Sequence, residues 1–403
     1  MKICIIGSLD TKSGDIEYLI SRFRDRGFQT CLIDTSVIGE SDVPSDIPPG
    51  EVARLGGEPL ESLRKRGDRG HALEIMSRGA VKAVRKLFEQ SEIDAVLGIG
   101  GGAGTSLACA AMRALPLGIP KVMLSTLASG TTDIYIREKD IVMVPSIVDI
   151  AGVNRISAGV YARAAGALIG MLEAKEPEQN FKPLIGASMF GNTTPAVQRC
   201  KEILEQGGKY EVLIFHANGT GGRTMETLIR EDRMLGVLDI TTTELADFIT
   251  GGVMSAGENR LTAAGDRAIP QVTAPGCLDM VNFWGRESIP AKYREDNNRT
   301  FYIWNPNVTL MRTTPEENEI LGKLMAEKLN RSRGSSAVVL PLKGFSLLDA
   351  PGEVFWQPEA DEAFFRSLRK YINSEIEIAE VDANINDPVF AETAAELLLR
   401  RMK

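Results

Sequence analysis

The sequence predicts an α/β protein with two domains, each a mainly parallel β-sheet flanked by helices. Short apolar runs alternate with amphipathic stretches along the chain, which is the pattern of repeated strand–helix–strand units. The 403 residues exceed what one ordinary core holds. The alternation pauses at the polar, proline-bearing segment 174–183 and then restarts. We therefore predict two Rossmann-like domains, residues 1–178 and 179–403.

The first half begins with a strand at 2–7 and a helix at 14–27, whose apolar residues recur at helical spacing and which ends at Gly27. A second strand, 29–35, follows. Residues 36–60 are rich in proline, glycine and acids, which favours a long loop. The remaining predicted elements are a helix at 69–90, strands at 94–100, 121–126 and 141–152, and a helix that ends near residue 174.

The second half repeats the alternation. Its predicted strands are 183–191, 210–217, 234–241, 270–276, 335–344 and 375–383, and its predicted helices are a segment ending at 204, 218–231, 242–252, 315–330, 361–372 and 387–402. Thr314 and Glu317 have the spacing of a capping box at the start of a helix. We place Glu244 and Asp247 on a helix surface.

Composition excludes several classes of protein. The formal net charge of −8 argues against a nucleic-acid surface, and no apolar run reaches membrane-spanning length. No cleavable signal segment is recognisable at the start. Five scattered cysteines fit a reducing cytoplasm, and we interpret Cys277 as a packing residue in preference to a nucleophile. Two histidines are too few for a metal site built on several imidazoles.

The clearest motif is a glycine-rich loop after a predicted strand. Gly100, Gly101, Gly102 and Gly104 are followed at once by Thr105 and Ser106 and then by a helix-forming stretch. Glycines permit close approach of a phosphate, and the free N–H groups of a helix start bind anions. The alternative is a tight turn that packs helix on strand. The loop lacks the Lys-Ser/Thr pair of a P-loop.

Other polar residues follow neighbouring strands of the same predicted sheet. Because the carboxyl ends of parallel strands meet at one edge, we expect these loops to converge on a polar crevice. Asp34 has the position of a ribose-binding acid and can equally cap its own turn. Lys12 and Asp10 either contact a ligand or belong to a solvent-exposed helix start, and the sequence leaves both alternatives open. The predicted set after the first and fourth strands is Gly7, Asp10, Thr11, Lys12, Thr126, Ser129, Gly130 and Asp133.

A second glycine loop, 216–226, opens a helix in the second half. His216 is a candidate general base, and Arg223 is a candidate clamp for a carboxylate or phosphate. Arg312, just before a predicted helix cap, is a third candidate for contact with an anion. Alternatively, His216 is a structural residue whose ring nitrogens form hydrogen bonds within the protein.

Several strings together resemble one family across residues 7–391. They are GSLDTK, GIGGGAGTSLA, PKVMLSTLASG, VPSIVDIAGVNRIS, NGTGGRTME, APGCLDMVNFW, NPNVTLMRTTPEE, LPLKGFSLLDAPG and INDPVFA. They are similar to the Tm-1-like family, also called UPF0261. The resemblance implies a two-domain α/β fold, ATP bound by the first domain through the strand-end loops named above, an accompanying Mg²⁺ ion, and a homodimer.

The sequence departs from the family pattern at two positions. Trp304 and Asn384 stand where the family usually carries histidine, which weakens transfer of any activity located in the second domain. Three functions remain open. The first is an ATP-binding enzyme acting on a small anionic metabolite at a cleft between domains. The second is a nucleotide-regulated interaction protein without turnover, and the third is a lyase or hydrolase of a carbohydrate-derived acid that does not use ATP.

Overall fold

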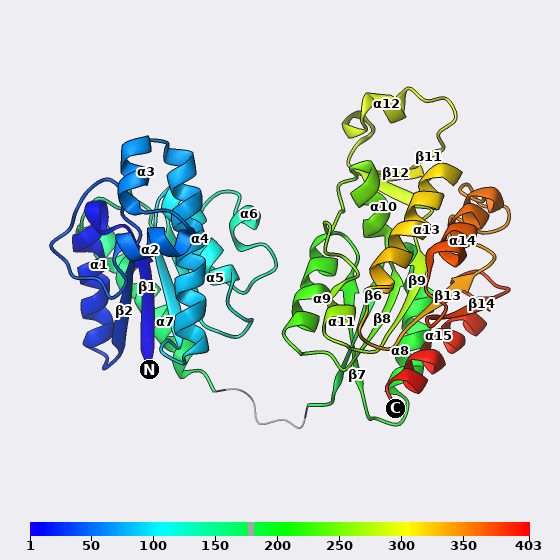
Figure 1. Cartoon of the computed structure of the whole chain (residues 1–403), viewed down its shortest axis with the longest axis horizontal. Helices are drawn as coiled ribbons and strands as arrows, with labels where there is room; N and C mark the ends of the chain where they lie inside the picture. The colour runs from blue at the N-terminus through cyan, green and yellow to red at the C-terminus, as the bar shows by residue number, and fades with distance from the viewer. Residues whose placement is uncertain (176–180) are drawn as a thin grey trace. The chain divides into compact units, whose positions relative to one another are not determined.

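A computed structural model describes residues 1–175 and 181–403, which belong to two compact units, Met1–Glu178 and Gln179–Lys403. Five residues of the predicted boundary segment 174–183, namely 176–180, lie outside the described residues. Each unit is built around a parallel sheet with helices on both faces (Figure 1), which confirms the predicted fold class of two Rossmann-like domains.

The first unit has five parallel strands in the order β2-β1-β3-β4-β5. They are β1 (Lys2–Gly7), β2 (Gln29–Asp34), β3 (Ala95–Gly100), β4 (Lys121–Ser125) and β5 (Val142–Pro145). Its helices are α1 (Leu9–Arg24), α2 (Pro49–Gly56), α3 (Leu60–Arg66), α4 (Arg69–Glu89), α5 (Gly102–Arg113), α6 (Asp133–Ile136) and α7 (Arg155–Glu173).

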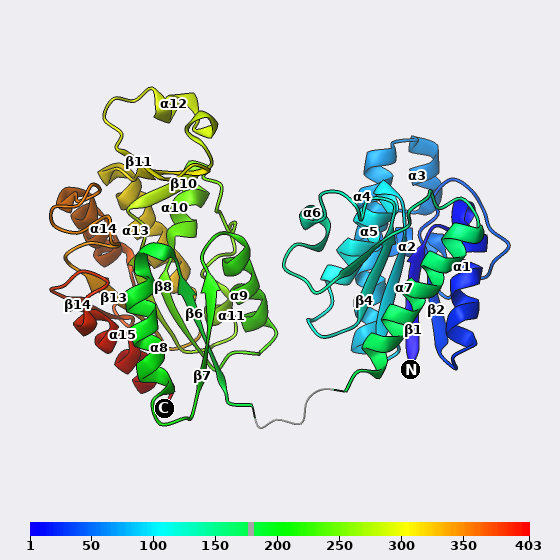
Figure 2. The same ribbon diagram turned by 180° about the vertical axis from the view of Figure 1, so that it is seen from behind.

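Two apolar layers enclose this sheet. Helices α1 and α7 cover one face, and α2, α4 and α5 cover the other (Figures 1 and 2). The buried Tyr161 hydroxyl of α7 donates a 2.7 Å hydrogen bond to Asp15 of α1 and joins the two helices. The chain leaves β1 and β3 toward opposite faces, so the loops that follow these strands diverge and leave a crevice between them.

The second unit repeats the plan with six parallel strands in the order β14-β13-β9-β8-β6-β7. They are β6 (Leu184–Met189), β7 (Glu211–His216), β8 (Gly236–Thr241), β9 (Gln271–Gly276), β13 (Ser336–Pro341) and β14 (Glu377–Val381). The helices include η1 (Gly191–Thr193), α8 (Thr194–Glu205), α9 (Thr220–Arg230), α10 (Thr243–Thr250), α11 (Ala263–Asp266), η2 (Arg286–Ser288), α12 (Ala291–Arg294), α13 (Pro315–Leu329), α14 (Pro358–Tyr371) and α15 (Pro388–Arg401).

Helices α8 and α15 pack on one face of this sheet, and α9, α10, α11, α13 and α14 pack on the other. A small antiparallel sheet, in the order β10-β12-β11, adds β10 (Met280–Phe283), β11 (Phe301–Asn305) and β12 (Val308–Arg312). No helix in the described part of the chain has the length and apolar character needed to cross a membrane.

Three local predictions are wrong. The segment 36–60 is not a continuous loop, because Pro49 starts α2, which buries Val52 and Ala53 against α4. The predicted strand 141–152 shortens to Val142–Pro145. The first helix starts earlier than predicted, at Leu9, and its backbone breaks at Lys12 (φ −135°, ψ 20°). The predicted capping box of Thr314 and Glu317 is confirmed.

Candidate functional site

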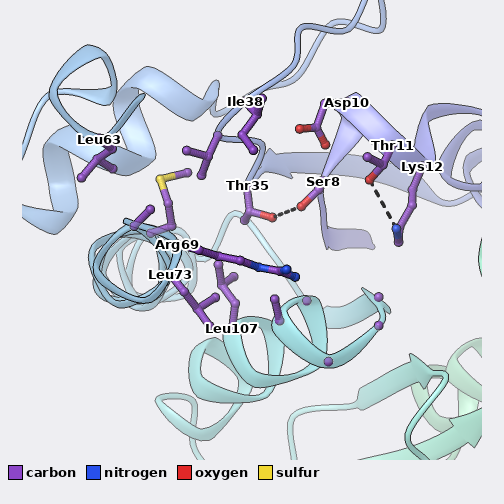
Figure 3. A pocket seen from close by; sticks show the side chains of 18 of the residues that line it. Ser8, Asp10, Thr11, Lys12, Thr35, Ile38, Leu63, Arg69, Leu73 and Leu107 are labelled. Carbon is purple, nitrogen blue, oxygen red and sulfur yellow. Dashed lines mark hydrogen bonds between the residues drawn. The ribbon is translucent and has the colours of Figure 1, made fainter. Parts of the chain in front are cut away.

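A cavity of about 620 Å³ lies at the carboxyl ends of β1 and β3, where the two chain connections diverge. It is bordered by the loop after β1, the loop after β2, the start of α5, and residues of α3 and α4 (Figure 3). Parallel α/β sheets bind their ligands at such a position. Of the residues predicted from the sequence, Asp10, Thr11, Lys12, Gly100, Gly101, Gly102 and Gly104 line this cavity.

The start of α5 supplies the main polar surface of the cavity. Gly101 is its N-cap and has no side chain with which to cap the helix. The first turn closes through Thr105 N–H to the Gly101 carbonyl at 2.8 Å, and no acceptor among the described residues is assigned to the N–H groups of 102–104. Unsatisfied N–H groups at a helix start carry partial positive charge and favour an anion.

The glycines around this loop fall into two kinds. A side chain at Gly7, Gly98 or Gly100 would collide with neighbouring protein atoms at 2.6–2.9 Å. A Cβ at Gly101 or Gly102 would meet nothing closer than 3.6 Å and 3.8 Å, and neither glycine has a positive φ. Packing therefore explains the first group only. The second group leaves open space at the cavity, where a ligand has room to approach the main chain closely.

Two cations accompany the free N–H groups. Lys12 lies at the break in α1, and its ammonium donates to the Thr11 hydroxyl at 3.3 Å. Arg69, the first residue of α4, extends into the cavity in Figure 3. No carboxylate of the described residues is paired with Arg69. Arg64 instead donates to the Val37 carbonyl at 2.6 Å and fixes the loop after β2.

The opposite wall of the cavity is apolar. It is formed by Val37, Ile38, Leu63, Ala72, Leu73, Met76, Ile99 and Leu107. Ile38 is 90% exposed although it is a large aliphatic side chain, and it lies at the rim. The cavity thus combines a cationic, N–H-rich end with an apolar wall, an arrangement that suits a ligand with an anionic part and a flat apolar part.

Several predicted residues serve the protein's own structure instead. Asp34 is buried, and its carboxylate accepts hydrogen bonds from Leu9 N–H (3.1 Å), Ser36 N–H (2.9 Å) and the Ser36 hydroxyl (2.5 Å). It therefore caps its own turn. The Thr105 hydroxyl is fully buried and lies 2.6 Å from that of Ser125. Ser106 and Gly7 are absent from the cavity lining.

The loop after β4 belongs to a separate, smaller hollow. Thr126 and Ser129 line it, whereas Asp133 is exposed at the start of the short helix α6 and Gly130 only closes a turn on Leu127. The expected single crevice is therefore two neighbouring hollows along one edge of the sheet.

The second glycine loop is closed by the protein itself. The Glu244 carboxylate accepts hydrogen bonds from Gly219 N–H (2.7 Å) and Gly222 N–H (3.1 Å), and it is fully buried. A Cβ at Gly222 would lie 2.2 Å from Glu244, and one at Gly221 would lie 1.9 Å from the His216 carbonyl. The placement of Glu244 and Asp247 on a helix surface was wrong, because both side chains are buried. An anion from solution finds this helix start already occupied.

A buried arginine holds this arrangement in place. Arg260 is fully buried and donates to Glu244 at 2.5 Å and to both oxygens of Asp239 at 2.5 and 2.6 Å. Glu226 lies 3.5 Å away on the same guanidinium. The burial of unpaired carboxylates would be costly, so the arginine and the carboxylates stabilise one another.

The other candidates of the second unit are also engaged structurally. Arg312 is buried and donates to Asp361 at 2.7 Å and to Asp349 at 3.4 Å, so the expectation that it contacts an external anion is wrong. Arg223 donates to the Ser255 carbonyl at 3.0 Å. His216 is exposed and stacks on Phe190 with ring centroids 5.2 Å apart.

At the two positions that depart from the family pattern, the side chains of Trp304 and Asn384 are not acid–base groups. Trp304 is 44% exposed and lies over Gly191, since a Cβ on that glycine would be 3.6 Å from the indole. The amide of Asn384 donates to main-chain carbonyls, among them those of Lys343 at 3.0 Å and Asp349 at 3.1 Å. The Asn384 amide thereby holds together the loop segments whose carbonyls it contacts.

Comparison with known proteins identifies the family. A model described as "Uncharacterised protein family (UPF0261) N-terminal domain" matches residues 1–177, and the C-terminal domain model of the same family matches residues 182–402. The chain belongs to the UPF0261 family. A UPF0261 protein of Clostridium tetani is 49% identical over 404 residues, which cover 100% of this chain and 99% of that protein.

The family also includes a longer plant protein. The ToMV resistance protein Tm-1(GCR237) of Solanum lycopersicum is 43% identical over 339 residues, which cover 82% of this chain and 44% of that protein. Among solved structures, a UDP-N-acetylglucosamine 2-epimerase from Rickettsia bellii is 14% identical, with 68% of this chain and 78% of that chain covered and a TM-score of 0.22. A likeness this weak carries no argument about this chain.

Sequence reasoning missed Arg69 and the apolar wall. Arg69 belongs to a helix predicted correctly, but no motif links it to the glycine loop. Only the packing of α4 beside α5 brings it to the cavity. In the sequence, Arg69 is distinguished only by its position as the first residue of a predicted helix. Many residues share that position, so it does not identify a cavity residue.

Replacement of Glu244 tests the closed second loop. Glu244→Ala would leave the N–H groups of Gly219 and Gly222 without an acceptor and Arg260 short of one partner, so we expect a loss of about 3 kcal/mol in the free energy of unfolding. Urea denaturation of the whole chain measures it. Glu74→Ala, which breaks an exposed ion pair with Arg78 within α4, is the control and should have little effect. Equal stability of Glu244→Ala and the parent would contradict the structural role.

Asp247 makes stability depend on pH in an unusual direction. Burial raises the pKa of this carboxyl from 3.8 to about 7, against the lowering effect of hydrogen bonds from Asn282 and Met254. Between these two values unfolding releases a proton, so the free energy of unfolding falls as pH rises, by up to about 1.4 kcal/mol per pH unit. Asp247→Asn should flatten this slope in denaturation curves recorded from about pH 4.5 to about pH 7.5. An unchanged slope would mean that Asp247 is ionised throughout.

Proposed function

We propose that the first unit of this UPF0261 protein binds ATP in the cavity between β1 and β3, with the phosphates at the start of α5. The observation that carries the proposal is the open space beside Gly101 and Gly102, combined with N–H groups that have no acceptor in the described part of the chain. Main-chain N–H groups exposed by glycine are the usual cradle for phosphate oxygens.

The rest of the cavity matches the remaining parts of a nucleotide. Lys12 and Arg69 supply positive charge for a triphosphate, and the apolar wall suits the face of a base. The wall is aliphatic, so it would hold the base by shape and burial of its faces. A volume of about 620 Å³ falls within the range of small-molecule and cofactor sites.

The described residues offer a magnesium ion one carboxylate ligand, Asp10. One Asp10 oxygen accepts the Gly39 N–H at 3.2 Å, and the other has no partner among the described residues. No group of three or more His, Cys, Asp or Glu side chains in the described ranges is arranged to hold a metal. Asp10 would therefore be the protein contact, and phosphate oxygens and water would supply the other ligands, as is common for Mg²⁺. The ion would neutralise phosphate charge.

The second unit supports no equivalent phosphate site, because Glu244 occupies its glycine loop. This supports a nucleotide site in the first unit and not in the second. Arg312 is separately engaged by Asp361 and Asp349, so its charge is already compensated within the protein. The geometry of the cavity is compatible with an enzyme and with a nucleotide-regulated interaction protein. A measurement of phosphate release from ATP distinguishes the two functions.

A side chain at Gly102 should block the phosphate position. Gly102→Val adds volume where the protein leaves room, so the fold should persist while ATP affinity falls at least 100-fold, as measured by isothermal titration calorimetry with and without Mg²⁺. Gly14→Val is the matched control, since this α1 glycine has nothing within 4 Å of an added Cβ and lies outside the cavity lining. Undiminished ATP binding by Gly102→Val would refute the placement of the phosphates.

Arg69 should contribute to the binding of ligands that carry phosphates and not to the binding of the nucleoside alone. We expect Arg69→Ala to weaken ATP binding about 10- to 100-fold, the loss typical of one charge-assisted hydrogen-bond donor, and to leave adenosine binding unchanged. The exposed Arg66, outside the cavity lining, provides the control substitution Arg66→Ala. Equal effects of Arg69→Ala on ATP and on adenosine would assign Arg69 to the base or ribose instead.

A further inference from the structure

The second hollow of the first unit has no role in the proposed nucleotide site. It has a volume of about 240 Å³ and lies at the carboxyl ends of β4 and β5. Its lining comes from two loops, with Thr126 and Ser129 after β4 and residues 146–149 after β5. The carboxyl ends of β3, β4 and β5 are adjacent in one sheet, so this hollow lies beside the glycine loop.

The hollow has more hydrogen-bonding capacity than the protein uses. The Ser146 hydroxyl is committed to the Val148 carbonyl at 2.6 Å, and one Asp149 oxygen accepts the Ile150 N–H at 2.8 Å. The hydroxyls of Thr126 and Ser129 and the second Asp149 oxygen have no partner in the described parts of the chain. Two hydroxyls and one carboxylate oxygen are thus available to a ligand.

The backbone that forms the hollow is strained at one position. Ile147 has φ +67°, which is rare for a β-branched residue, and its side chain is 69% exposed. A residue in this region is energetically costly, and such residues gather at ligand sites. The strain lies between Ser146 and Asp149, within the loop that lines the hollow. Ile147 and Val148 give the hollow an apolar surface beside its polar groups.

We propose that this hollow, with a volume of about 240 Å³, binds a small neutral polyhydroxy molecule. Vicinal hydroxyls would donate to Asp149 and bond to Thr126 and Ser129, while the C–H face packs on Ile147. The lining contains a carboxylate and no cation, so an anion of the same size is disfavoured. The proposal rests on the lining of this hollow and holds with or without a nucleotide in the neighbouring cavity.

The size and position agree with a molecule that lies next to the proposed phosphates. A Cβ at Gly101 would be 3.6 Å from the Thr126 hydroxyl, so Gly101 and Thr126 lie side by side between the two hollows. Phosphate charge at the start of α5 would further disfavour an anion near Thr126.

The test uses two four-carbon probes that differ in charge, erythritol and erythronate, added to the full-length protein without nucleotide. Saturation-transfer NMR titration should show erythritol binding more tightly than erythronate. Asp149→Asn and Thr126→Val should each weaken erythritol binding about tenfold or more, the loss typical of a hydrogen bond to or beside a charged group. Asp25→Asn, at the far end of α1, is the control and should bind erythritol as the parent does.

Three results would overturn the proposal. They are tighter binding of erythronate than of erythritol, absence of erythritol binding to the folded parent protein, and erythritol binding that neither variant weakens. Circular dichroism verifies that each variant is folded before titration. Because no nucleotide is present, a failure here is distinct from a failure of ATP to bind.

Discussion

The main-chain N–H groups at the start of α5 are the constraint on which the candidate site depends. A helix start exposes partial positive charge that must be met by a side chain, by water or by a ligand. Glycine at 101 and 102 removes the side chains that would otherwise cap or cover those groups, and neighbouring atoms leave the space open. Lys12 and Arg69 add charge of the same sign. An anion is the natural complement of that surface.

In the second unit, a side chain of the protein itself accepts hydrogen bonds from the N–H groups at the corresponding helix start. Its parallel sheet and its glycine loop before α9 resemble those of the first unit, but Glu244 lies against the N–H groups of Gly219 and Gly222. Arg260 then compensates that carboxylate and Asp239 in an environment closed to water. Two loops of similar composition thus differ in one respect: a carboxylate of the chain contacts the N–H groups of the second loop, whereas those of the first loop face open space.

The remaining charged residues of the second unit follow the same principle. Arg312 lies among Asp349, Asp361 and Asp279, and burial raises the pKa of Asp279 to about 7. Such clusters tie the loops at the carboxyl edge of the sheet together. A buried ion pair is costly to break, because removal of one partner leaves the other charged and unsolvated. The buried charged residues of this cluster therefore have a role in the internal structure of the second unit.

Local patterns determined a large part of the fold. Alternating apolar runs identified every strand of the two parallel sheets, and the cap at Thr314 marked a helix start because that signal is local. The first helix ends at Arg24, three residues before the predicted end at Gly27. The antiparallel strands β10 and β11 escaped prediction, since short strands beside turns have no distinctive period. Helix α2 was missed because its prolines and acids suggest a loop, and only its burial against α4 reveals it.

The sequence by itself determined that a glycine loop follows a strand and opens a helix in each half. It could not determine which glycines border open space and which accommodate the protein's own atoms. That distinction depends on side chains distant in the sequence, with Arg69 brought to one loop and Glu244 to the other. Only the tertiary structure decided it, because the free N–H groups of a helix start take whichever anion the packing of the chain allows to reach them.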